Sequence, residues 1–135
     1  MERERRILTT NDVRSIFNTE FSPVASHFFP PFELNIEQIR RSNDPNVCNP
    51  GVYVYCHPIK GVIRVGVSMV NSRKRALQHI DKNTGGIMKE LSNDESTRIL
   101  LFNIINEEKD HWVKALERYF EKEKVLDPLI PPGRK

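Results

Sequence analysis

The sequence predicts an α+β fold: a small, mainly antiparallel three-stranded sheet flanked by helices, with an N-terminal helical extension. In residues 51–57 and in residues 62–67, every second side chain falls on the same face, with one set of residues alternating with the other. This period of two is typical of β-strands. Residues 99–105 form an apolar run broken only by Asn103, and its shortness favours a central strand over a buried helix. Residues 107–126 carry apolar side chains at spacings of three and four, which predicts an amphipathic helix.

Length and composition indicate one domain with a packed core. The chain has 135 residues, of which 38% are hydrophobic and 29% are charged. We expect residues 1–45 to form a helical and loop extension that packs on a domain of residues 46–135. Cys48 and Cys56 lack the spacing of a redox or zinc motif, and we expect no disulfide between them.

The charge and hydropathy of the chain limit its partners. The net charge is +3 and the isoelectric point is about 9.0, which weakly favours a polyanion. The first ten residues mix both charges and lack the apolar run of a signal peptide, and no stretch is long enough to span a membrane. We therefore expect a cytoplasmic protein without membrane contact, and the oligomeric state stays open.

The N-terminal third predicts short elements. Residues 10–18 form an amphipathic helix capped by Thr10 or Asn11. Residues 21–34 contain three prolines, which exclude regular helix, and we expect a loop whose phenylalanines pack on the domain. The alternative, that these aromatic rings grip nucleic-acid bases, is less favoured. Within residues 35–41, an asparagine followed three residues later by a glutamine predicts a capping box and a short helix.

The two alternating segments predict a β-hairpin. Residues 57–61 hold a proline and a glycine, which suit a chain reversal. A hairpin centred on them places Tyr53 about opposite Arg64, with both side chains on one face of the sheet. The first of these strands therefore presents a tyrosine, and the second presents a cation.

A helix is expected directly after this hairpin. Asn71 or Ser72 can cap it, because both side chains accept hydrogen bonds from backbone N–H groups. Arg75 and His79 are four residues apart and so lie on the same helical face. Residues 81–92 are then expected to form a loop followed by one or two helical turns.

These motifs resemble the GIY-YIG endonucleases, a family named for two strand tripeptides. The first tripeptide corresponds to residues 51–53 (GVY) and the second to residues 64–66 (RVG), and Arg75 and His79 follow on the next helix. The resemblance covers about the last two thirds of the chain. It implies a metal-dependent endonuclease that hydrolyses phosphodiester bonds in DNA, with Mg²⁺ or Mn²⁺ as cofactor.

The resemblance also implies roles for individual residues. Tyr53 would orient or deprotonate the attacking water, because a phenol can do so if its pKa of about 10 is lowered. Arg75 would hold the scissile phosphate, since a guanidinium matches two phosphate oxygens. His79 would share the acid–base work or hydrogen-bond the phosphate. Contacts to nucleic acid are expected around the start of the same helix: Ser68, Asn71, Arg73 and Lys74.

The implied metal ligand is a carboxylate on the last helix. Glu117 lies beside the apolar stripe of this helix, which is followed by a proline-containing segment, as in the family. A single hard cation held by one carboxylate and several waters can stabilise the leaving oxygen. Glu107 and Glu108 are the alternatives, because no other motif fixes the register of the helix.

One position departs from the family pattern. The second tripeptide normally begins with a tyrosine of the active site, and here that residue is Arg64. On one interpretation Arg64 lowers the pKa of Tyr53 and orients a phosphate or water, so that the enzyme remains active. On the other, cleavage is lost and the chain is a nucleic-acid-binding module of the same fold. A protein-interaction domain without nucleic acid is a third possibility if the basic residues prove scattered.

Overall fold

The computed structural model describes residues 5–42, 44–82, 90 and 93–130, and it contains an antiparallel sheet in the order β1-β4-β2-β3. The four strands are β1 (Phe32–Asn35), β2 (Gly51–His57), β3 (Gly61–Ser68) and β4 (Arg98–Asn103). The prediction of an α+β fold with an antiparallel sheet is confirmed, but the number of strands was wrong, because β1 adds a fourth. The loop and helical turns expected over residues 81–92 lie largely outside the described residues.

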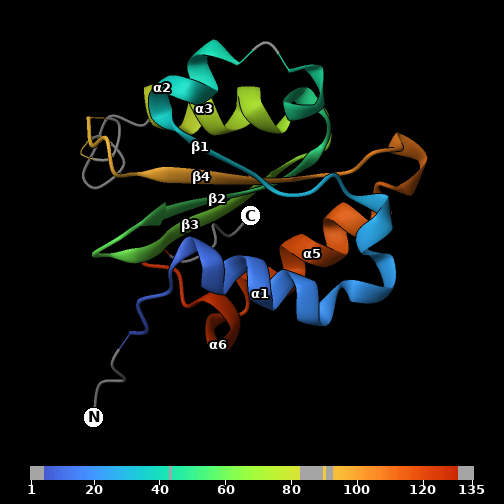
Figure 1. Ribbon diagram of the computed structural model, residues 1–135, viewed down its shortest axis with the longest axis horizontal. Coiled ribbons are helices and arrows are strands. Elements are labelled where there is room, and N and C mark those ends of the chain that lie inside the picture. Colours follow the sequence, from blue (N-terminus) through green and yellow to red (C-terminus); the bar gives the residue numbers. More distant parts are fainter. Residues whose placement is uncertain (1–4, 43, 83–89, 91–92, 131–135) are drawn as a thin grey trace.

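Helices cover both faces of the sheet (Figure 1). One face carries α2 (Ile36–Arg41) and α3 (Ser72–Lys82), and the other carries α1 (Thr10–Glu20), α5 (His111–Glu121) and α6 (Glu123–Leu126). Three short 3₁₀ helices complete the described elements: η1 (Ser22–His27), η2 (Pro45–Cys48) and η3 (Glu107–Lys109). Along the described part of the chain, no helix combines the length and apolar character needed to cross a membrane.

The fourth strand comes from the proline-rich segment that was predicted to be a loop. Its prolines do exclude α-helix, but Pro23 lies in the first turn of η1, and Pro31 directly precedes β1. β1 pairs with β4 from Phe32 opposite Leu101 to Asn35 opposite Arg98. A four-residue strand at the edge of the sheet tolerates neighbouring prolines, because its outer side needs no ladder hydrogen bonds.

Both helix caps expected in the N-terminal third exist, one of them at a different residue. Gln38 N donates to Asn35 Oδ1 over 2.7 Å, and Asn35 N donates to Gln38 Oε1 over 2.8 Å, so this capping box is confirmed. α1 is capped by Thr9 instead of Thr10 or Asn11. Asp12 N donates to the Thr9 hydroxyl and Thr9 N donates to the Asp12 carboxylate. Each such cap contributes about 1 kcal/mol to helix stability.

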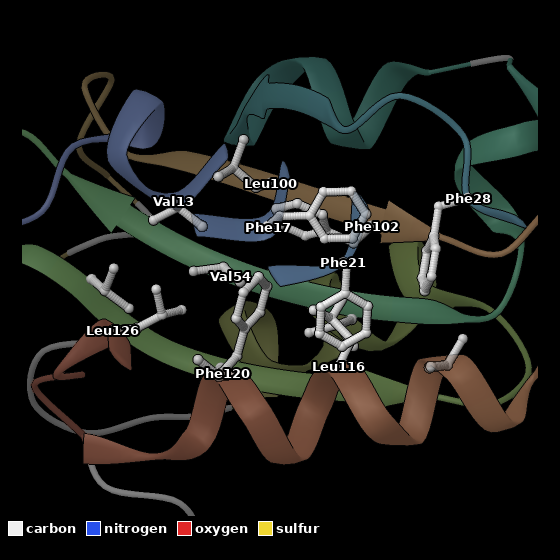
Figure 2. Close-up of a cluster of buried hydrophobic side chains, with 14 of the residues drawn as sticks. Val13, Phe17, Phe21, Phe28, Val54, Leu100, Phe102, Leu116, Phe120 and Leu126 are labelled. Atoms are coloured by element: carbon white, nitrogen blue, oxygen red, sulfur yellow. The ribbon is translucent and has the colours of Figure 1, made fainter. Parts of the chain in front are cut away.

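The larger core cluster lies between the sheet and the layer of α1, α5 and α6 (Figure 2). The ring of Phe17 on α1 lies 5.4 Å from that of Phe28 and 5.0 Å from that of Phe102, measured between centroids. Phe28 is buried, so the aromatic segment packs on the domain as predicted. Cys56 is buried in this cluster, and both cysteines are free.

The long final helix predicted over residues 107–126 is broken into η3, α5 and α6. Its apolar stripe is confirmed, because Val113, Leu116 and Phe120 are buried. The break falls at Lys122, whose backbone is extended. In a continuous helix, Leu126 would point about 120° away from that stripe; the break turns it back into the core, where it is fully buried.

Both ends of the described chain meet at the start of β3. The guanidinium of Arg5 donates to the carbonyls of Lys60, Val62 and Asp127. Leu129 N donates to Val62 O over 3.0 Å, and Ile130 N donates to the next carbonyl of β3 over 2.8 Å. The C-terminal segment therefore covers the first part of the free edge of β3.

Candidate active site

The hairpin of β2 and β3 has a different register from the predicted one. Tyr53 pairs with Gly66, and Arg64 pairs with Tyr55. The turn is centred on Ile59, and a β-bulge then places one extra residue in β3. Together these two features shift the partner of Tyr53 by two residues. Because a shift of two preserves the alternation of faces, Arg64 still lies on the face of Tyr53.

The side chain of Tyr53 crosses the neighbouring strand at a glycine. A Cβ atom at Gly66 would lie 2.3 Å from Tyr53 Cζ and 2.5 Å from its hydroxyl oxygen, which is too close for any real side chain. The phenol therefore lies over the backbone of β3, which is one of the two edge strands of the sheet. The glycine of the second tripeptide provides the space for the tyrosine of the first.

Three charged side chains act on this phenol from three different elements. Burial is the largest influence on its pKa and raises it to about 12. Arg75 on α3, through its charge and a hydrogen bond, and Arg64 on β3 both lower this pKa, whereas Glu117 on α5 raises it. Arg64 thus lowers the pKa of Tyr53, as expected, but the net pKa is raised, because burial outweighs both cations. Tyr53 is 1% exposed and stays protonated at neutral pH.

The N-terminus of α3 is fixed by side chains that were predicted to contact nucleic acid. Asn71 caps the helix, since its Oδ1 accepts from Lys74 N over 2.9 Å, as one of the two predicted caps. The hydroxyl of Ser68 accepts from the backbone N–H groups of Val70 and Asn71, over 3.2 and 2.9 Å. Both side chains thus hold the turn between β3 and α3.

The other predicted residues of α3 differ in their surroundings. Arg73 donates to the carbonyls of Ile39 and Arg40 and so joins α3 to the end of α2. Lys74 and Arg75 are exposed, and Arg75 also lies 3.3 Å from Gln78 Oε1. His79 belongs to α3, but its side chain lies outside the described part of the structure. Lys74 and Arg75 therefore both carry positive charge at the surface of α3, and Arg75 is the one that acts on Tyr53.

Glu117 is half-buried on α5, on the opposite side of the sheet from α3. Its charge reaches the phenol of Tyr53, whereas Glu107 and Glu108 are exposed on η3. Within the described residues, no group of three or more His, Cys, Asp and Glu side chains gathers to enclose a metal ion. Mg²⁺ does not require such a cage, because it is often held by one or two carboxylates, waters and the phosphates of a substrate. The single carboxylate of Glu117 fits this second mode.

Two pockets, of about 280 and 300 Å³, lie elsewhere, around the start of β4. His57 lies in the wall of one of them, with its Nε2 2.7 Å from Asp94 Oδ2. The Nδ1 of His57 accepts from the N–H groups of Ile59 and Lys60, so both ring nitrogens hold the turn and the loop before β4. Neither pocket includes Tyr53, Arg64, Arg75 or Glu117.

Sequence reasoning did not single out Tyr55, which the structure places beside Tyr53. Alternation along β2 puts both tyrosines on one face, and this was the signal available in the sequence. The hydroxyl of Tyr55 donates to the carbonyl of Ala76 on α3 over 2.7 Å.

Comparisons with protein-family models, curated proteins and solved structures find no match to the chain. The function of this cluster therefore has to follow from the chemistry of its side chains.

Proposed function

We propose that this protein is a metal-dependent endonuclease of the GIY-YIG type that hydrolyses phosphodiester bonds in DNA. The observation that carries the proposal is the packing of Tyr53 over Gly66, on the face of the sheet that also holds Arg64. The charges of Arg75 and Glu117 also act on its phenol. A phosphodiester hydrolase needs cations for the phosphate and a carboxylate for a metal ion. Arg64 lies on the edge strand β3 and Arg75 is exposed on α3, where a long polyanion can reach them without entering a pocket. The carboxylate of Glu117 acts on the same phenol from α5.

The two arginines bind the scissile phosphate. Arg75 is exposed and Arg64 is half-buried, so both guanidinium groups can reach a ligand at the surface. A guanidinium donates two parallel hydrogen bonds to phosphate oxygens and keeps its charge at any working pH. Lys74, which is exposed on α3 like Arg75, adds electrostatic attraction for the phosphates of the DNA backbone next to the scissile one.

Tyr53 acts in its neutral form. With a pKa of about 12 it is a poor base at neutral pH, so it does not deprotonate the attacking water. Its hydroxyl interacts instead with Arg75 and thereby holds the guanidinium in place for the phosphate. Mg²⁺ or Mn²⁺ held by Glu117 would supply positive charge for the phosphate and the leaving oxygen.

Nicking of supercoiled plasmid DNA tests the proposal. The wild type should nick only with Mg²⁺ or Mn²⁺ present and not with a chelator, and Glu117→Gln should abolish nicking while circular dichroism shows an intact fold. Glu107→Gln and Glu108→Gln are matched controls that should remain active. Full activity of Glu117→Gln would remove the assignment of Glu117 as the metal ligand. Nicking by the wild type without metal would reject the metal dependence, and absence of nicking would reject the nuclease.

A second candidate function is supported by Arg64, which stands where the family has a tyrosine. A module that binds DNA without cleaving it would keep the cations of β3 and α3 and need no metal ligand. Binding without metal-dependent nicking would select this second function. Absence of DNA binding would leave the protein-interaction domain.

A further inference from the structure

We infer that Tyr55 is a positioning residue that fixes Arg75 in the site, and its effect on catalysis rests on the proposed function. Tyr55 is fully buried in β2, so it cannot touch a ligand itself. Its hydroxyl donates to the carbonyl of Ala76 over 2.7 Å. Ala76 follows Arg75 directly in α3, so this bond holds the backbone from which Arg75 projects.

Tyr55 contacts the site at two further points. Its ring lies 5.7 Å from the ring of Tyr53 between centroids, with 39° between the ring planes. Arg64 is its partner across the β2–β3 pair. One side chain thus adjoins Tyr53 and Arg64 and holds the backbone next to Arg75, although it makes no contact with solvent.

The Tyr55 hydroxyl holds the middle of α3 to the sheet through a backbone carbonyl, and a buried side-chain anchor at the first turn of the helix complements it. Ser72, at the first turn, lies with its hydroxyl 2.6 Å from the Oδ1 of Asn103, which is buried in β4. Arg73 also bonds from this first turn, to carbonyls of α2, and a helix fastened at its first turn can still tilt about that turn. Ala76 lies one turn further on, about 6 Å along the axis, on the same buried side. The two anchors together set the rotation of α3 and therefore the direction of Arg75.

Tyr55→Phe removes only this hydroxyl and is the variant to test. The rate constant of single-turnover cleavage should fall by about tenfold or more, since small displacements of a positioning group have effects of that order. The dissociation constant for DNA should change by less than about threefold, because Arg64, Lys74 and Arg75 all remain. Phe17→Leu, in the core on the opposite face of the sheet, serves as a control for general loss of stability and should retain its cleavage rate.

A readout without DNA separates the positioning role from the nuclease. Solvent exchange of the Arg75 guanidinium protons, followed by ¹⁵N nuclear magnetic resonance, should be faster in Tyr55→Phe than in the wild type and unchanged in Phe17→Leu. Ser72→Ala, which removes the other anchor, should also speed exchange and replaces Tyr55→Phe if that variant does not fold. Unchanged exchange would overturn the positioning role even in an active nuclease. Faster exchange in Tyr55→Phe, in a protein that does not cleave DNA, would support the positioning role of Tyr55 and reject the nuclease.

Discussion

The ring of Tyr53 lies across the backbone of Gly66, so a methyl group at residue 66 would fall 2.3 Å from its Cζ atom. This contact joins the two tripeptides of the hairpin physically, because one supplies the ring and the other supplies the space for it. Gly51 has a similar role at the first tripeptide. A Cβ atom there would lie 2.1 Å from the Oδ1 of Asn103, the buried amide that anchors α3.

Gly66→Ala should destabilise the protein by about 1–3 kcal/mol, the usual cost of inserting a methyl group into a filled space. Urea unfolding measures the free energy directly. In a Tyr53→Leu background the smaller side chain no longer reaches across the strand, so the same substitution should cost less. Equal costs in the two backgrounds would show that the ring is not what excludes a side chain at residue 66.

Arg75→Ala should weaken DNA binding and flatten its dependence on salt. Each phosphate contact that is lost lowers the slope of log affinity against log salt concentration by about one. Fluorescence anisotropy at several salt concentrations gives this slope. Lys109→Ala removes one exposed charge from η3, away from α3, and should leave the slope nearly unchanged. An Arg75→Ala slope equal to that of the wild type would mean that Arg75 does not contact phosphate.

Arg64 separates the active enzyme from the binding module. If Arg64 holds the phosphate, Arg64→Ala should reduce metal-dependent cleavage by about tenfold or more, the cost of losing one charge-assisted contact. Arg64→Tyr introduces the residue that GIY-YIG endonucleases have at the start of the second tripeptide. Plasmid nicking by the three proteins, compared at matched stability, provides the measurement. An inert wild type beside an active Arg64→Tyr would select the binding module.

Asp94 should make the folded state sensitive to acid. Hydrogen bonds from Ser96 and His57, those from Ser96 first, hold the pKa of Asp94 at about 2. A carboxylate with a lowered pKa stabilises the folded state above its ordinary pKa near 4, and this contribution is lost as the pH falls toward 2. Asp94→Asn should therefore flatten the pH dependence of urea unfolding between pH 4 and 2. Ser96→Ala should give an intermediate curve, and identical curves for all three proteins would contradict the assignment.

The alternating pattern of β2 and β3 gave the faces of the hairpin but not its register. A period of two places Tyr53 and Arg64 on one face whether or not the pairing shifts by two residues. The bulge that sets the register leaves no mark in that pattern, since Ile63 is as apolar as Val62 before it. Strand β1 was missed for a related reason: Phe32–Asn35 is too short to show a period, and β4 selects it by pairing.

Local patterns gave the residue types of the site but not their electrostatics. The helical spacing placed Glu117 beside the stripe of Leu116, and the cap at Asn71 placed Arg75 on the first turns of α3. The pKa of Tyr53 depends on how deeply the whole fold buries it, and no neighbour in the sequence reports that depth. Tyr55 was missed because its hydrogen-bond partner is a backbone carbonyl, that of Ala76. A pattern of side-chain types in the sequence does not reveal such a backbone partner.

The strand order has a consequence for the synthesis of this chain on the ribosome. β2 and β3 adjoin in sequence, so their hairpin can close as soon as both have emerged. β1 cannot pair until β4 has emerged, because β4 occupies the position between β1 and β2 in the sheet. β4 lies far downstream, at Arg98–Asn103. At about 5–20 residues per second, β1 spends several seconds without its partner. The prolines just before β1 hinder wrong pairing during that interval, because proline cannot donate to a ladder.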